Sequence, residues 1–223
     1  MSAFEARNLA CSRAGRRIFA ALDFTLPAGG ALILRGANGS GKSSLLRVLA
    51  GLLAPVGGEL HWDGKAVNDD PEAFQDNICY VGHGNAIKPV LTVHENLAFW
   101  SKLYPPKSAE GYDGLLDQAL ETFSLTALRD VPGRQLSSGQ SRRLSLSRLI
   151  TSPARIWLLD EPSVGLDDVS LKRLEAAIAE HRAGGGMVIA ATHTPLDIAD
   201  ADLLLLQDFA PPAIDPELLE NSW

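Results

Sequence analysis

The chain has 223 residues, 46% of them hydrophobic, which is enough for one sizeable domain with an inserted subdomain but short for two full domains. Its formal net charge of −7 argues against nucleic acid as the main partner, because no broad basic face is available to neutralise phosphates. No apolar run is long enough to cross a bilayer, the N-terminus lacks a signal-peptide pattern, and the two cysteines have no metal-site spacing. We therefore expect a cytoplasmic protein with reduced thiols.

The front of the chain is predicted to form strands. Alternating apolar and polar residues, a short apolar run and an Asp63-Gly64 hairpin tip are the signals, and they cover residues 4–9, 22–26, 31–34 and 59–65. These segments are expected to form a small mixed sheet.

Helical patterns dominate after a buried strand at residues 78–81. They predict helices over residues 93–103, about 114–123 and about 139–150. Thr92 is the expected cap of the first helix, and Pro105-Pro106 is expected to end it. This block is interpreted as an inserted helical subdomain, residues 84–150.

The sheet resumes with the apolar run 156–160, which is typical of a parallel strand covered on both faces. A helix over residues 170–181 and a buried strand over 187–192 follow, so strand and helix alternate as in βαβ units. Residues 207–223 are rich in proline and acids, and they are predicted to be an exposed acidic tail.

A phosphate-binding loop lies between the apolar run 31–34 and the next helical segment. It matches the pattern G-x-x-x-x-G-K-[ST] at every position: Gly36, Ala37, Asn38, Gly39, Ser40, Gly41, Lys42 and Ser43. The glycines let successive backbone N–H groups point at phosphate oxygens. Lys42 is expected to reach the β- and γ-phosphates, and the Ser43 hydroxyl to coordinate Mg²⁺.

Asp160 and Glu161 stand at the carboxyl end of the strand 156–160, where open α/β sheets place their ligands. Such a pair often only begins a loop, but downstream of a phosphate loop it indicates catalysis. Asp160 is expected to hold Mg²⁺ through water. Glu161 is expected to orient and deprotonate an attacking water.

The segment 136–140, here called the signature segment, begins a helix shortly before that strand. Ser137 and the N–H groups of Ser138, Gly139 and Gln140 could form a second anion site, although serine and glycine clusters usually mean turns. The turn that ends in Asp167 and a histidine after the last buried strand, His193, complete the order of motifs.

With these motifs in this order, residues 3–206 resemble the nucleotide-binding subunit of ATP-binding-cassette transporters. The resemblance implies an α/β P-loop NTPase domain, residues 1–206, with an N-terminal antiparallel β subdomain and the inserted helical subdomain. In it residues 1–83 and 151–206 form the core and β subdomain.

For function, the resemblance implies a dimer of two copies that sandwiches two ATP molecules, each held by the phosphate loop of one copy and the signature segment of the other. Glu161 would be the general base, Asp167 would couple the two sites, and His193 would contact the γ-phosphate.

Three positions depart from the usual pattern of that family. His83 stands where glutamine is usual, and it should make ATPase activity more steeply pH-dependent because imidazole charges near neutral pH. Ser138 replaces a glycine, which should cost little in a helical backbone. The adenine-stacking aromatic is missing, so Arg13 is the candidate to stack on adenine, and Phe19 is expected in the core.

A block around His83 is similar to the ATP-binding subunit of the haem exporter used in cytochrome c maturation. The matching residues of this block are Gly82, His83, Ile87, Lys88, Leu91, Thr92, Glu95, Asn96, Leu97, Phe99 and Trp100. Residues 136–140, the pair Arg142-Arg143 and residues 157–162 fit the same subunit. This second resemblance implies a peripheral protein on the cytoplasmic face of the bacterial inner membrane. Integral permease subunits would be its direct partners, and a haem-handling chaperone would be served indirectly.

The apolar residues of that block, with Lys88 and His94, mark the expected docking region for the membrane subunits. Two alternatives remain open at this point: the ATPase subunit of another exporter, and a soluble cassette ATPase outside transport. The chain has neither the heptads nor the second cassette that such soluble proteins carry.

Overall fold

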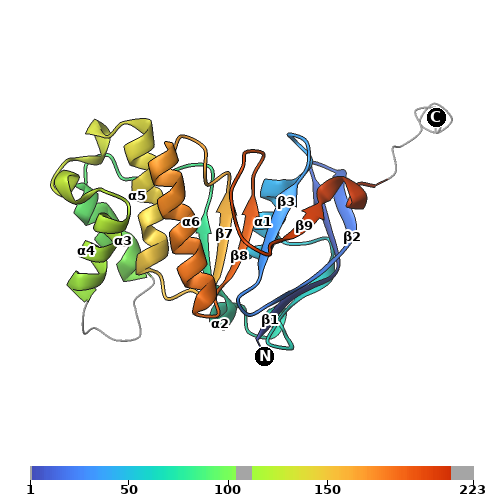
Figure 1. The fold of residues 1–223 in the computed structure, drawn as a ribbon. Coiled ribbons are helices and arrows are strands. Elements are labelled where there is room, and N and C mark those ends of the chain that lie inside the picture. Colours follow the sequence, from blue (N-terminus) through green and yellow to red (C-terminus); the bar gives the residue numbers. More distant parts are fainter. Residues whose placement is uncertain (1, 104–111, 212–223) are drawn as a thin grey trace.

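A computed structural model describes residues 2–103 and 112–211, which fold into two sheets flanked by helices (Figure 1). The strands are β1 (Ala3–Arg13), β2 (Arg16–Pro27), β3 (Ala31–Arg35), β4 (Gly57–Trp62), β5 (Lys65–Ala66), β6 (Ile78–Val81), β7 (Ile156–Asp160), β8 (Met187–Ala191) and β9 (Asp202–Leu205). The α-helices are α1 (Lys42–Leu49), α2 (Pro71–Gln75), α3 (Val93–Leu103), α4 (Tyr112–Thr122), α5 (Ser138–Thr151) and α6 (Asp168–Ala183).

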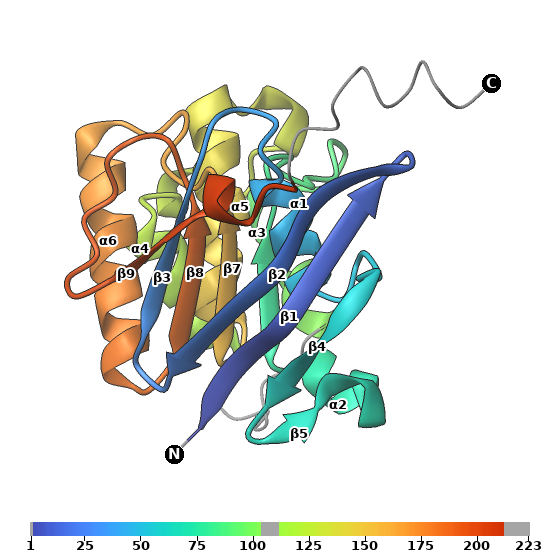
Figure 2. The ribbon, with the colours of Figure 1, turned by 90° about the vertical axis from the view of Figure 1, so that its right-hand side faces the viewer.

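The N-terminal sheet has the order β2-β1-β4-β5 and every pair in it is antiparallel (Figure 2). Asp63 and Gly64 both have positive φ, 51° and 78°, as a two-residue hairpin turn between β4 and β5 requires. The predicted hairpin is therefore confirmed. The expected mixed sheet is wrong in one respect, because β3 pairs with β8 and β9 in the other sheet.

The second sheet is parallel and has the order β6-β7-β8-β3-β9. Its strand β7 is buried at every residue, and successive side chains enter two different cores. Leu158 packs on the N-terminal sheet side, and its neighbour Trp157 packs on the helical side. This two-sided burial explains the unbroken apolar runs in the sequence.

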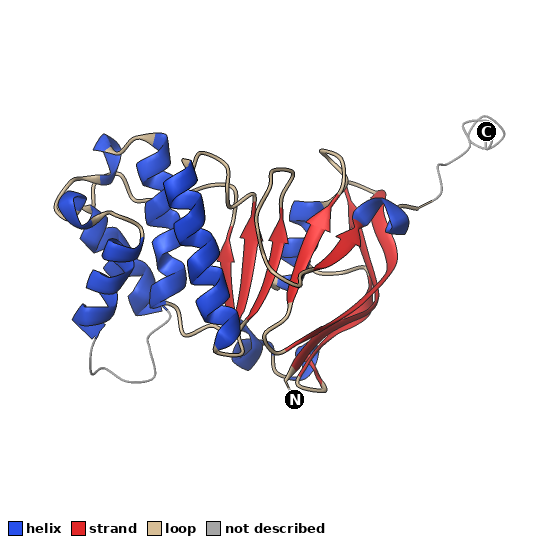
Figure 3. Cartoon of the chain, in the orientation of Figure 1, coloured by secondary structure: helices blue, strands red, loops and turns tan. Residues whose placement is uncertain are grey.

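The helices divide between the two faces of the parallel sheet. Helix α1 packs with the antiparallel sheet in one core, and α3, α4, α5 and α6 pack in the other (Figures 1 and 3). The Thr92 Oγ1 accepts from the Glu95 N–H at 3.1 Å and Glu95 Oε2 accepts from the Thr92 N–H at 2.8 Å, which confirms Thr92 as the cap of α3. We propose residues 84–150, which contain α3, α4 and all but the last residue of α5, as the inserted subdomain.

Several local elements were not predicted, among them one helix, one strand and one 3₁₀ helix. Helix α2 is capped by the Asp70 side chain, and β9 forms an edge of the parallel sheet. A 3₁₀ helix, Leu206–Phe209, continues from β9, and Phe209 packs against the core, so the predicted start of the tail at residue 207 is too early. Pro105-Pro106 and residues 212–223 lie outside the described residues.

Candidate active site

The phosphate loop connects β3 to α1, as predicted, and its backbone needs glycine. Gly41 has φ 104°, and a Cβ on it would lie 2.2 Å from Cγ2 of Ile18 on β2. A Cβ on Gly36 would lie 2.6 Å from the Ser40 Oγ. A side chain at either position would therefore force the loop out of its present path.

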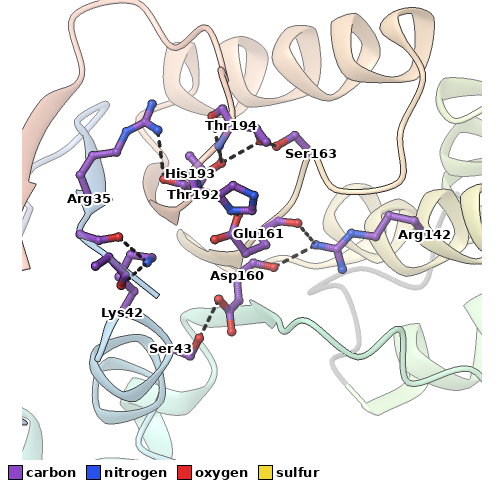
Figure 4. A network of polar contacts seen from close by, with 12 residues as sticks. Arg35, Lys42, Ser43, Arg142, Asp160, Glu161, Ser163, Thr192, His193 and Thr194 are labelled. Carbon is purple, nitrogen blue, oxygen red and sulfur yellow. Dashed lines mark hydrogen bonds and ion pairs between the residues drawn. The ribbon is translucent and has the colours of Figure 1, made fainter. Parts of the chain in front are cut away.

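Lys42 points back into this loop. Its ammonium donates to the Gly36 carbonyl at 2.7 Å and to the Ala37 carbonyl at 3.1 Å, and the residue is 7% exposed (Figure 4). The Ser40 Oγ is buried and has no hydrogen-bond partner among the described residues. A Cβ on Gly39 would meet nothing within 4 Å, so the loop has open space beside it. A buried ammonium and an unpartnered hydroxyl around open space fit a polyphosphate.

Ser43, in the first turn of α1, contacts Asp160, the last residue of β7. The Ser43 Oγ donates to the Asp160 Oδ1 at 3.0 Å, and Asp160 is 3% exposed at the end of β7. Two adjacent oxygen ligands suit Mg²⁺, which usually keeps water and substrate phosphates as its other ligands. No cluster of three His, Cys, Asp or Glu residues that could hold a metal is found in residues 2–103 and 112–211.

Glu161 and His193 also meet. The His193 Nδ1 lies 2.9 Å from the Glu161 Oε2, which also accepts the His193 backbone N–H at 3.3 Å. The Glu161 backbone has φ 49°, in the left-handed region, and its N–H donates to the Ala191 carbonyl at 2.8 Å. Such strain, of the order of 1 kcal/mol, is concentrated at functional sites in folded proteins.

Polar residues that the sequence analysis missed stand behind this pair. The hydroxyls of Ser163 and Thr194 lie 2.5 Å apart, and Thr192 Oγ1 accepts the Thr194 N–H at 3.1 Å. Arg35, the last residue of β3, donates to the Thr192 carbonyl at 3.1 Å (Figure 4). These contacts fix the loop after β8 that carries His193. In the sequence, the only sign that these residues belong to the site is that they stand at or just after the ends of strands.

The signature segment forms the beginning of α5. Ser137 and Gln140 make a capping box, with the Ser137 Oγ accepting the Gln140 N–H at 3.2 Å and the Gln140 Oε1 accepting the Ser137 N–H at 2.8 Å. Ser138 is the first residue of the helix, so its side chain in place of hydrogen causes no backbone strain.

The signature segment lies beside the turn that ends in Asp167. A Cβ on Gly139 would lie 3.1 Å from the carbonyl oxygen of Gly165. The Asp167 side chain caps α6 by accepting the Ser170 N–H at 2.8 Å, and hydrogen bonds with Ser170 lower the pKa of this exposed carboxyl. Asp167 therefore has a structural role beyond any role in coupling two sites.

His83 and Arg13 lie outside these contacts. His83 is exposed at the wall of a cavity of about 420 Å³, whose other lining residues include Arg47, Tyr80 and Trp100. No hydrogen bond joins His83 to Asp160 or Glu161 in the part of the chain that the structure describes. Tyr80 lines the same cavity and lies close to Asp160, so it connects the cavity to the site. Burial raises the pKa of its phenol most, and the charge of Asp160 raises it further.

Arg13 is exposed at the tip of the β1–β2 hairpin, opposite Arg16. Ile18 of this hairpin packs on the phosphate loop, and the sequence analysis did not single it out. Phe19 is fully buried, as expected.

The fold and the site together define an ATPase of the ATP-binding-cassette class. The family model described as ABC transporter matches residues 19–164. The chain superimposes with a TM-score of 0.79 on an ABC transporter ATP-binding protein from Pyrococcus furiosus, at 24% identity, over 94% of this chain and 100% of that one. An ATP-binding subunit of another ABC transporter gives a TM-score of 0.78 at 24% identity, over 85% of this chain and 79% of that one.

Curated relatives give the narrower assignment. The cytochrome c biogenesis ATP-binding export protein CcmA of Paramagnetospirillum magneticum is 54% identical over 94% of this chain and 96% of the relative. The protein of the same name from Rhodospirillum rubrum is 52% identical over 93% of this chain and 87% of the relative. The chain belongs to this family of cytochrome c biogenesis ATP-binding export proteins, within the ABC transporters.

Proposed function

We propose that the protein hydrolyses ATP to drive a bacterial inner-membrane exporter required for c-type cytochrome biogenesis. ATP hydrolysis is supported by one arrangement in the structure: beside the phosphate loop, Ser43 contacts Asp160 and His193 contacts Glu161. The names of the curated relatives support the pathway.

The roles of the residues follow from their chemistry. The N–H groups of residues 36–43 and the Lys42 ammonium bind the phosphates, and Lys42 exchanges its loop carbonyl partners for phosphate oxygens. Glu161 accepts a proton from water as the water oxygen bonds to the γ-phosphorus and the bond from that phosphorus to the β–γ bridging oxygen breaks. His193 orients the Glu161 carboxylate and contacts the γ-phosphate.

Mg²⁺ would be held by the Ser43 hydroxyl and, through water, by Asp160, and it would neutralise charge that develops on the phosphates. The adjacent placement of these two oxygen groups supports the assignment. Arg13 is the proposed adenine contact, because it extends from the same hairpin that packs on the phosphate loop through Ile18.

A second copy of the chain would complete each ATP site. Figure 4 places Lys42 and Ser43 on one side of Asp160 and Glu161, and Arg142 of α5 on the other. The Ser137 to Gln140 segment begins that same helix, so its N–H groups are proposed to bind the γ-phosphate held by the partner copy. Asp167 would lie at this interface, where the turn that it ends touches Gly139.

The proposed contact with the permease subunits is the cavity beside His83 and the adjoining segment. Val90 is 75% exposed there, and the Lys88 ammonium lies 4.4 Å from the centre of the Phe99 ring. Leu97, in contrast, is fully buried and belongs to the core. Lys88→Glu removes this cation and reverses the charge, so it should weaken association with the membrane subunits. A Lys88→Glu protein that retains them would contradict docking here.

Within residues 2–103 and 112–211, no helix combines the length and the apolar character needed to cross a membrane. We propose a peripheral location on the cytoplasmic face of the inner membrane, maintained by the permease subunits.

The test is covalent-haem staining of c-type cytochromes in cells whose only copy of the gene encodes Glu161→Gln. We expect the stained bands to disappear, because Gln cannot accept the proton from water. Glu180→Gln, an exposed change on α6, is the matched control and should leave the bands intact. Expression and membrane association are verified for both. Unchanged bands in Glu161→Gln cells would contradict the assigned pathway.

A further inference from the structure

One buried side chain connects three segments of the site. Arg142, in the second turn of α5, is 4% exposed, and its guanidinium donates only to backbone carbonyls in the described part of the chain. Nη1 donates to the Gly82 oxygen at 2.9 Å, and Nη2 donates to the oxygens of Asp160 at 2.9 Å and Glu161 at 2.7 Å. A longer bond of 3.3 Å runs from Nε to the Pro162 oxygen.

These acceptors are the carboxyl ends of two neighbouring parallel strands. Gly82 follows β6, and Asp160 ends β7. Only arginine offers donors in a fixed planar fork that can serve several carbonyls at once. Burial lowers the pKa of Arg142, whereas the charge of Asp160 raises it. The nearby carboxylates therefore help to keep a buried cation in place without a direct ion pair.

The backbone of Glu161 is held on both sides. Its N–H donates to the Ala191 carbonyl at 2.8 Å, and its carbonyl accepts from Arg142 at 2.7 Å. Between these two bonds the residue keeps a φ of 49°, which needs support from its surroundings in a residue with a side chain. The same two bonds set the direction in which the carboxylate leaves the backbone, toward His193 (Figure 4).

The Gly82 bond extends this connection to the cavity. Gly82 and His83 both line the cavity, and the Gly82 carbonyl is the atom that Arg142 holds. The Arg142 guanidinium therefore binds the segment 82–83 with one hydrogen bond and the backbone of Asp160 and Glu161 with others. A displacement of that segment changes the first bond and can be passed on through the guanidinium to Glu161.

We propose that Arg142 is a positioning residue that holds the Glu161 carboxylate in its hydrolytic orientation and connects it to the wall of the cavity. This inference rests on the proposed ATPase function. It assigns Arg142 an effect on turnover that is exerted through Glu161, with no contact to ATP. A purely structural arginine would satisfy the same carbonyls, but its replacement would alter stability and leave the kinetics of the folded protein unchanged.

The test compares Arg142→Lys with Arg143→Lys in the purified protein. A lysine at residue 142 keeps the charge and one donor group, but it cannot serve Gly82 and the β7 end together. Arg143, the next residue of α5, donates instead to the carbonyls of Phe123 and Ser124 at 3.2 and 3.4 Å. Circular dichroism and urea unfolding establish that both variants are folded before kinetics are measured.

We expect Arg142→Lys to lower kcat at least tenfold while KM and the affinity for a fluorescent ATP analogue change less than threefold. For Arg143→Lys, kcat and KM should both stay within twofold of the wild type. A folded Arg142→Lys protein with a kcat within twofold of the wild type overturns the inference and leaves the proposed function standing. A wild-type protein that does not hydrolyse ATP overturns both.

A second measurement asks whether Arg142 acts through Glu161. Single-turnover hydrolysis of radiolabelled ATP is measured for Glu161→Gln with and without Arg142→Lys. If Arg142 acts only by orienting the Glu161 carboxylate, the added substitution changes the residual rate less than twofold. A further tenfold loss in the double variant would overturn the positioning role, because it would show that Arg142 acts independently of that carboxylate.

Discussion

The imidazole of His193 is within hydrogen-bond distance of the Glu161 carboxylate, with 2.9 Å between Nδ1 and Oε2. The two residues come from different strands, since Glu161 follows β7 and His193 follows β8. The parallel pairing of Asp160 with Ala191 sets this proximity. The histidine side chain is 55% exposed and the glutamate side chain 14%, so the histidine is the more open member of the pair.

We therefore expect His193→Ala to lower kcat by a factor of about 10 to 100, because a hydrogen bond that orients the Glu161 carboxylate is lost. Affinity for ATP should change much less, since the phosphate loop and Lys42 are untouched. Steady-state ATPase assays and nucleotide titration of the isolated protein measure the two quantities. His94→Ala, a histidine of α3 away from the site, is the control and should keep wild-type turnover. Equal kcat values for the two variants would count against the role of His193.

The second prediction concerns His83 and pH. His83 lines the cavity that adjoins the site through Tyr80, and histidine is the residue type that most often acts as a pH switch in proteins. The ATPase activity of the wild type should therefore vary with pH more steeply than that of His83→Gln, whose side chain does not titrate. Parallel assays from pH 6 to 8 in one buffer mixture of constant ionic strength measure the difference. Superimposable profiles would exclude a titrating role for His83.

The sequence was most informative where one local pattern determines the structure. The phosphate loop, the buried strands β7 and β8, and the cap at Thr92 follow from short-range rules of composition and spacing. The edge strand β9 was missed because its residues are not uniformly buried: Leu203 is 59% exposed and Leu204 is 6% exposed. Strand β6 has the same length and also lies at an edge, but its first and last residues are buried, whereas β9 begins with two exposed residues.

The contacts that complete the site are long-range, and no local pattern contains them. Ile18 reaches Gly41 from the β1–β2 hairpin, and Arg142 reaches Gly82 over 60 positions of sequence. Arginine in a polar helix ordinarily indicates a solvated face, whereas Arg142 is buried because the strand ends offer it four carbonyls. Only the three-dimensional arrangement of β6, β7 and α5 shows this.

The third prediction concerns packing around His181. Its ring stacks on Trp157 with centroids 3.8 Å apart and planes 9° from parallel, and a Cβ on Gly186 would lie 2.3 Å from the ring. Gly186→Ala should therefore lower the free energy of unfolding by about 1–3 kcal/mol, since the stacked ring has little freedom to move. Gly184→Ala is the control: φ is −77°, the nearest atom would be 3.4 Å away, and the change should stay within about 0.5 kcal/mol. Urea unfolding that gives equal losses for both would refute the steric argument.

The last prediction follows from the charge state of the same histidine. Burial lowers the pKa of His181 from 6.5 to about 4, and its Nε2 has no hydrogen-bond partner among the described residues. The folded protein therefore keeps this ring neutral at a pH where the unfolded chain already binds the proton. Stability that the neutral ring contributes is fully present above pH 6.5 and decreases as the pH falls toward 4.

Between pH 8 and pH 5.5 this difference in pKa should cost about 1 kcal/mol of unfolding free energy, and the lower limit stays above the sequence pI of about 5.2. His181→Phe keeps an aromatic ring over Trp157 but cannot bind a proton. The variant should therefore lose about 1 kcal/mol less than the wild type over this interval, whatever its stability at pH 8. Urea unfolding of both proteins at the two pH values gives the comparison. Equal losses would mean that His181 is protonated in the folded state, in conflict with its burial against Trp157.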